Sequence, residues 1–224
     1  MAEYQLLVVA HPDDEAIFFS SLLLQKRELP WKVICVTDGD ADGQGGERRQ
    51  HWVKAMKAFN ISDFQHWTFP DIFEERLEIA ALQSKISALP RPKMAYTHGI
   101  LGEYGHPHHQ DVSYAMHSVL SDKIPLYSTS YNCHSDFALQ LTKTEFALKL
   151  SILFDIYGSQ FRGFANKLPA TEYEGFQRVG IAEVTSIYKF LSLREPLRET
   201  ALIKYRHLFE HVVQVFGEPL RRPF

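Results

Sequence analysis

The first hundred residues alternate short strand-like segments with longer segments of helical character. Strands are predicted over residues 4–10, 31–37, 64–69 and 93–97, and the first of them is a continuous apolar run of the buried type. Helices are predicted between them, over residues 12–27, 47–59 and 73–89. Continuous apolar strands indicate a parallel sheet that is buried on both faces. The chain is therefore predicted to adopt an α/β fold of Rossmann-like architecture, with a mostly parallel sheet and helices on both faces.

The pattern beyond residue 97 is weaker. Helices are predicted over 107–120, 143–155 and 197–216, with an extended segment over 126–131 and a long loop over 163–175. No linker interrupts the chain, so we expect one domain over residues 1–224. Residues 1–120 would form its core, and residues 121–224 would complete the fold and border the pocket.

Composition bounds the location and the partners. The 224 residues carry a net charge of −3, which gives no electrostatic reason to expect nucleic acid or an anionic membrane as a partner. The N-terminus lacks a secretion signal, and no apolar run reaches membrane-spanning length. Two cysteines make no disulfide framework. We expect a cytoplasmic protein, with homo-oligomer formation left open.

Two histidine–proline motifs follow predicted strands. Residues 10–15 read AHPDDE directly after the first strand, and residues 105–109 read GHPHH shortly after the fourth. In each motif the proline can open a helix, so the residues behind it occupy the first helical turn. The carboxyl ends of parallel strands meet at one edge of a sheet. The sequence therefore predicts a site at this edge, formed by His11, Asp13, Asp14, His106 and His109.

These side chains suit a catalytic metal site. Two histidines and a carboxylate favour zinc or a similar divalent ion, and catalytic zinc takes three protein ligands. The two remaining groups suit proton transfer and oxyanion stabilisation. In the alternative reading, the aspartates only stabilise a helix N-terminus and the histidines are solvated. Two motifs at matching strand ends favour a site.

The two motifs together resemble those of the LmbE-like (PIG-L) de-N-acetylases. The similar segments are AHPDDE at 10–15 and GEYGHPHH at 102–109, within the first 120 residues. The resemblance implies a Rossmann-like zinc enzyme that hydrolyses N-acyl groups, usually an acetyl group on an amino sugar. It implies zinc as the cofactor, with Fe²⁺ or Co²⁺ as alternatives.

The resemblance also implies individual roles. His11, Asp14 and His109 match the metal ligands, and Asp13 matches the general base that takes a proton from the metal-bound water. His106 matches the residue that stabilises the oxyanion or protonates the departing amine. His108 stands where relatives often have an acidic residue, and a fourth imidazole would alter the local charge.

Three further residues are candidates for substrate binding. Arg48 and Asp71 match residues that contact substrate in relatives, Asp71 through a sugar hydroxyl. In the alternative reading, Arg48 is a solvated helix-start residue and Asp71 a turn residue beside Pro70. Glu15 would bind substrate or support Asp14 from behind.

The predicted function is thus that of a metal-dependent amide hydrolase acting on linear C–N bonds. Its partner would be a small N-acylated amino sugar or glycoside. The alternative is a sugar-binding module of the same fold that lacks turnover. A Rossmann-type nucleotide binder is disfavoured because no G-x-G-x-x-G segment follows the first strand.

Overall fold

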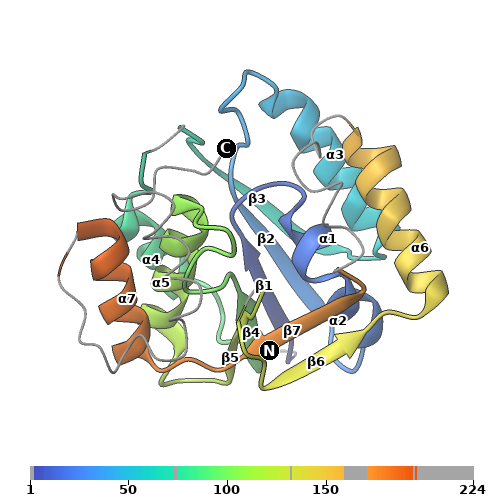
Figure 1. Cartoon of the computed structure of the whole chain (residues 1–224). Coiled ribbons are helices and arrows are strands. Elements are labelled where there is room, and N and C mark those ends of the chain that lie inside the picture. The colour runs from blue at the N-terminus through green and yellow to red at the C-terminus, as the bar shows by residue number, and fades with distance from the viewer. Residues whose placement is uncertain (1–2, 73–74, 132, 159–170, 194, 196–224) are drawn as a thin grey trace, which may run out of the picture.

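A seven-stranded sheet in the order β3-β2-β1-β4-β5-β7-β6 forms the centre of the molecule (Figure 1). The computed structural model describes residues 3–72, 75–131, 133–158, 171–193 and 195. The strands are β1 (Gln5–Val9), β2 (Trp31–Thr37), β3 (Asp63–Phe69), β4 (Met94–Thr97), β5 (Leu126–Thr129), β6 (Phe137–Gln140) and β7 (Tyr173–Gln177). Strands β1 to β5 pair in parallel, and β7 runs antiparallel to both of its neighbours. The mostly parallel sheet predicted from the sequence is confirmed.

Strand β1 lies at the centre, between β2 and β4. Leu7 and Val9 pack into the apolar core on one face of the sheet, whereas Leu6 and Val8 pack into the core on the other. All four side chains are fully buried. This explains why the strand reads as a continuous apolar run rather than an alternating one.

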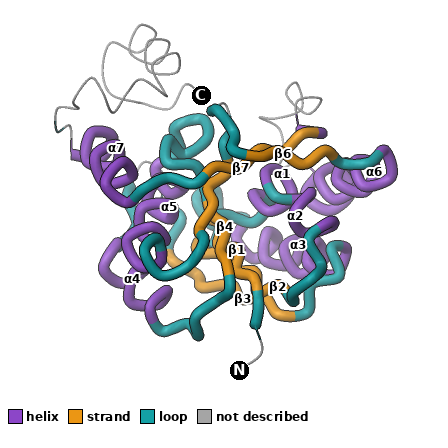
Figure 2. Tube along the Cα trace, turned by 90° about the horizontal axis from the view of Figure 1, so that it is seen from below, coloured by secondary structure: helices purple, strands orange, loops and turns teal. Residues whose placement is uncertain are grey.

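Helices cover both faces, as expected (Figure 2). On one face lie α1 (Asp14–Phe18), α2 (Ser20–Gln25), α3 (Gly45–Ala58), α6 (Lys143–Ser151) and the π-helical segment η1 (Ile152–Tyr157). On the other lie α4 (Ile79–Ser87), α5 (Pro107–Leu120) and α7 (Ile181–Leu193).

The helix expected over 12–27 is divided at Phe19 into α1 and α2. Two charged side chains from the C-terminal half, Lys149 and Glu174, bind the backbone groups of one helical hydrogen bond. Lys149 Nζ donates to the Ile17 carbonyl oxygen at 2.7 Å, and the Ser21 N–H donates to Glu174 Oε2 at 2.7 Å. These are the two backbone groups that would otherwise pair within a continuous helix.

Other boundaries also differ from the expectation. α4 begins only at Ile79, and residues 75–78 are not helical; there the Leu77 N–H donates to Asp111 Oδ2 at 2.9 Å. Strand β7 begins inside the segment expected to be a loop, so that part of the expectation was wrong. β6 and α7 were not expected. The helix expected over 197–216 lies outside the described residues.

Among the residues that the structure describes, no helix is both long and apolar enough to cross a membrane.

Candidate metal centre

The chain turns from β1 into α1 through His11 to Asp14. Asp14 Oδ2 accepts a hydrogen bond from the His11 N–H at 2.7 Å, which closes the turn. Asp13 has φ of 115° and ψ of −27°, a strained conformation for a residue with a side chain. The turn brings the side chains of His11 and Asp14 to one point at the carboxyl end of β1.

The second segment connects β4 to α5. Gly102 has φ of 69°, and a Cβ there would lie 2.5 Å from the His106 carbonyl oxygen, so the turn requires glycine. Pro107 is the first residue of α5, and His106 Nδ1 accepts from the His108 N–H at 3.2 Å as the helix cap. His109 therefore lies in the first turn of the helix, with no exposed surface.

His11, Asp14 and His109 bring three ligand atoms together. His11 Nδ1 lies 3.2 Å from His109 Nε2 and 3.4 Å from Asp14 Oδ2, and His109 Nε2 lies 3.3 Å from Asp14 Oδ1. Ligand atoms bound to a tetrahedral zinc ion lie about 3.4 Å from one another, given bonds of about 2.0–2.1 Å. All three side chains are buried. The donors and their spacing thus fit a divalent ion.

Two residues outside the predicted set hold His109 in place. Glu103 Oε2 lies 2.5 Å from His109 Nδ1, which leaves Nε2 to face Asp14. The other carboxylate oxygen lies 3.1 Å from His98 Nδ1, and His98 Nε2 accepts from the Ala10 N–H at 2.8 Å. A carboxylate behind a ligating histidine is typical of metal sites. Sequence reasoning missed both residues, although His98 follows β4 directly and Glu103 belongs to the GEYGHPHH segment.

The charges of two of the ligands suit a cation. Burial lowers the pKa of His109 to about 4, so its imidazole is neutral at pH 7. Burial disfavours a charged Asp14, but His109, His98 and His11 together hold its pKa well below the usual range. For His11, burial lowers the pKa, but hydrogen bonds to Asp14 and Asp71 outweigh it and raise the pKa to about 10. A metal ion therefore competes with a proton at His11.

Asp13 and His106 flank these ligands. Burial raises the pKa of Asp13 well above its usual value, and Asp14 and Glu15 add to the effect. The His106 ring stacks on that of His109 with centroids 4.6 Å apart. Because its Nδ1 accepts a hydrogen bond, a neutral His106 carries its proton on Nε2.

Glu15 is fully buried and bonded through both carboxylate oxygens. Tyr157 Oη donates to Oε1 at 2.7 Å, and the Asp13 N–H donates to Oε2 at 3.1 Å. Burial raises the pKa of Glu15 to about 8. Glu15 thus lies in the interior and accepts a hydrogen bond from the Asp13 backbone.

Arg48 and Asp71 occupy different places in the site. Arg48 lies on α3, its side chain is 19% exposed, and Nη2 donates to Asp42 Oδ2 at 3.1 Å. Its charge opposes the rise in the pKa of Asp13, but Arg48 is not brought into the ligand set. Asp71 follows β3, and its Oδ1 lies 3.3 Å from His108 Nδ1 and 3.7 Å from His11 Nε2.

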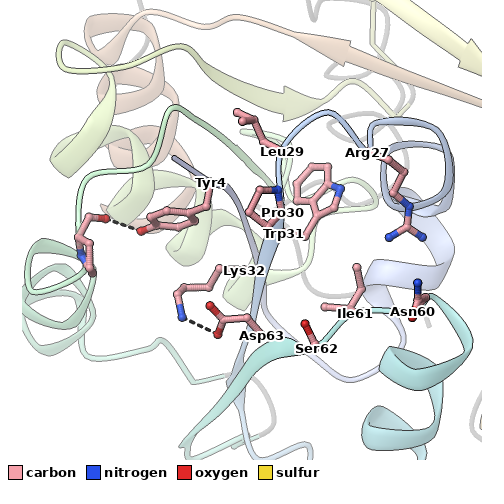
Figure 3. Close-up of a pocket in the computed structure, with 11 residues that line it drawn as sticks. Tyr4, Arg27, Leu29, Pro30, Trp31, Lys32, Asn60, Ile61, Ser62 and Asp63 are labelled. Atoms are coloured by element: carbon pink, nitrogen blue, oxygen red, sulfur yellow. Dashed lines mark hydrogen bonds and ion pairs between the residues drawn. The ribbon is translucent and has the colours of Figure 1, made fainter. Parts of the chain in front are cut away.

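A separate hollow of about 590 Å³ lies at the opposite edge of the sheet, where β1, β2 and β3 begin (Figure 3). Four of the polar side chains that line it bond to nearby groups. Lys32 Nζ donates to Asp63 Oδ1 at 2.6 Å, Arg27 Nη2 donates to the Phe59 carbonyl at 2.5 Å, and Tyr4 Oη donates to the Pro90 carbonyl. The hollow contains none of the predicted site residues.

Two relatives match part of the chain. An uncharacterized protein, L374, of Acanthamoeba polyphaga mimivirus is 29% identical over 131 residues, 51% of this chain and 57% of the relative. The N-acetylglucosaminyl-phosphatidylinositol de-N-acetylase of Saccharomyces cerevisiae is 42% identical over 96 residues, 38% of this chain. That match spans 31% of the yeast protein. The matches therefore span less than two thirds of either relative.

The fold and the motifs agree with a family assignment. The N,N′-diacetylchitobiose deacetylase of Pyrococcus horikoshii superposes with a TM-score of 0.63 at 16% identity, over 90% of this chain and 89% of that one. At this identity the likeness concerns the fold alone. The family model for GlcNAc-PI de-N-acetylases, PIG-L, matches residues 6–120, which include both histidine motifs. With just over half of its length in that match, the chain belongs to the PIG-L (LmbE-like) family.

Proposed function

We propose that the protein is a metal-dependent hydrolase that removes an N-acyl group, the acetyl group in first place, from an amino sugar or related small molecule. The observation that carries the proposal is the convergence of His11, Asp14 and His109, with Asp13 and His106 beside them. The names of the yeast and Pyrococcus proteins support the reaction class.

His11, Asp14 and His109 would hold the ion through Nδ1, a carboxylate oxygen and Nε2. The mixed nitrogen and oxygen donors favour zinc, with Fe²⁺ or Co²⁺ as alternatives. When bound, such an ion polarises the acyl oxygen and lowers the pKa of a water molecule toward neutrality.

The chain's own residues would move the protons. Asp13 accepts a proton from the attacking water, and a positioned carboxylate is suited to this role. His106 donates its Nε2 proton toward the developing oxyanion or the departing amine. Glu15 and Tyr157 hold the Asp13 backbone.

The partner would be a small N-acylated amino sugar or glycoside, and Arg48 would contact it. Neither nucleic acid nor a membrane is part of the proposal. A cytoplasmic location is supported by the two unpaired cysteines, Cys35 and Cys133.

An acetate-release assay over a panel of N-acetylated sugars and glycosides tests the proposal. Protein of measured zinc content should release acetate and the free amine from at least one member. Chelation should abolish release, and added zinc should restore it; iron and cobalt are tested in the same way. A metal-loaded protein that binds these sugars without hydrolysing any would instead support the non-catalytic sugar-binding module.

A further inference from the structure

The two ring nitrogens of His11 face different groups. Nδ1 faces His109 and Asp14, the other proposed ligands. Nε2 faces His108 Nδ1 at 3.1 Å and Asp71 Oδ1 at 3.7 Å. The His11 side chain is only 8% exposed, so water contributes little to either face.

This arrangement has a chemical consequence for metal binding. A neutral imidazole that coordinates through Nδ1 carries its proton on Nε2. That N–H lies in a buried region and requires an acceptor, because leaving it unpaired costs about 1–3 kcal/mol. His108 Nδ1 and Asp71 Oδ1 are the described acceptors that face it.

Both acceptors are held by the fold. Asp71 follows β3, and its N–H donates to Asp38 Oδ1 at 3.0 Å, which ties it to the loop behind β2. His108 lies in the first turn of α5, and its side chain is 2% exposed. Its Nδ1 lies 3.3 Å from Asp71 Oδ1. When His108 carries its proton on Nε2, Nδ1 accepts from His11; when it carries the proton on Nδ1, it donates to Asp71, and the carboxylate is the acceptor for His11.

We infer that His108 and Asp71 are positioning residues for the metal centre, which fix the ring of His11 with Nδ1 toward Asp14 and His109. The inference rests on the metal site of the proposed function. It assigns Asp71 to the metal centre, in place of the sugar-hydroxyl contact that resemblance to relatives implies. It also gives a role to His108, which stands where relatives often carry an acidic residue.

Zinc affinity of the purified protein measures this role without knowledge of the substrate. His108→Leu removes the ring nitrogens, and Asp71→Ala removes the carboxylate oxygens, so each variant lacks one acceptor for the His11 N–H. Each should raise the zinc Kd about 10–100-fold, as expected when the partner behind a ligating histidine is lost. His108→Asn keeps an acceptor near the position of Nδ1, and its Kd should stay within about threefold of wild type.

His117→Leu is the matched control, because His117 is also buried on α5 but bonds to Ser113 and Ser128. It should leave the zinc Kd unchanged even if the melting temperature falls. Wild-type affinity in His108→Leu, or equal loss in His117→Leu or in His108→Asn, overturns the role of His108. Wild-type affinity in Asp71→Ala overturns that of Asp71. If the wild-type protein binds no zinc, it is the proposed metal site that fails.

Discussion

Asp13 combines a strained backbone with an unusual use of its side chain. It is the N-cap residue of α1, and its carbonyl oxygen accepts from the N–H groups of Ala16 and Ile17 at 2.9 Å. An aspartate at this position commonly caps the helix with its carboxylate, but Asp13 makes no such bond. Its positive φ costs about 1–3 kcal/mol. Strain of this kind, combined with a carboxylate that does not cap its helix, suits a residue that transfers protons.

Two substitutions separate proton transfer from metal binding. Asp13→Ala should lower kcat about 10²–10⁴-fold with the zinc content unchanged, because only the general base is lost. His109→Ala should lower zinc affinity instead. Acetate release and bound zinc are measured on the same samples. Normal release by either variant contradicts the role given to that residue.

His117 makes stability depend on pH. Burial lowers its pKa from 6.5 to about 4, so the unfolded chain takes up a proton at pH 5 and the folded chain does not. The folded state therefore loses stability as the pH falls from 6.5 toward 4. Relative to His117→Leu, the wild type should lose about 2 kcal/mol between pH 7 and pH 5. Denaturant unfolding at both pH values measures the difference, and a constant difference contradicts the assignment.

At the scale of elements, a π-helical segment of the second half contacts the first histidine motif. The segment after α6 continues as the π-helix η1, a form often found at functional sites. Its last residue, Tyr157, reaches Glu15, and Glu15 accepts from the Asp13 N–H. One element of the second half thereby supports the turn that carries the proposed general base.

Tyr157→Phe should lower kcat at least about tenfold with zinc affinity unchanged, because a loosened Asp13 is misplaced relative to the reacting water. Tyr188→Phe is the matched control: Tyr188 Oη also bonds to a buried carboxylate, that of Asp111, at 2.7 Å. Both variants should lose about 0.5–1.5 kcal/mol of stability. Equal kcat values for the two variants would falsify the support given by Tyr157.

At the scale of the whole molecule, a buried ion pair joins the two halves of the chain. Lys149 Nζ donates to Glu174 Oε1 at 2.6 Å and to the carbonyl oxygens of Ile17 and Thr171. Glu174 Oε2 accepts from both the N–H and the hydroxyl of Ser21. The pair thus connects α6, β7 and the break between α1 and α2. The ammonium of Lys149 and the carboxylate of Glu174 neutralise each other, and both make further hydrogen bonds.

Lys149→Met should lower the free energy of unfolding by about 3–5 kcal/mol, because Glu174 would stay buried without its partner. We also expect a single unfolding transition in both proteins, as one domain over residues 1–224 requires. Calorimetry and denaturant unfolding test both points. Two transitions, with only one shifted by the substitution, would show that the halves fold separately.

Local pattern was enough for the first half of the fold. The strands β1 to β4 were predicted to within a residue or two, since strand-like and helix-like segments alternate regularly in this half and each strand is bounded by its neighbours in sequence. Two local motifs at strand ends predicted that His11, Asp14 and His109 converge with Asp13 and His106, and the family resemblance of these motifs proposed the first three as the ligand set. That they come within 3.2–3.4 Å of one another follows from the parallel pairing of β1 with β4.

Only the tertiary structure decided the remainder. β7 contains Gly175 and the buried Glu174, and neither residue favours a strand. The partner of Glu174 is Lys149, which lies 25 residues earlier in the sequence. The break at Phe19, the carboxylate of Glu103 behind His109 and the contact of Asp71 with His108 depend in the same way on partners brought together by the fold. The sequence determined the strands β1 to β4 and the motifs that carry the proposed ligands because periodicity and motifs are local. Burial of a charged side chain depends on a distant partner, and only the folded chain brings that partner into contact.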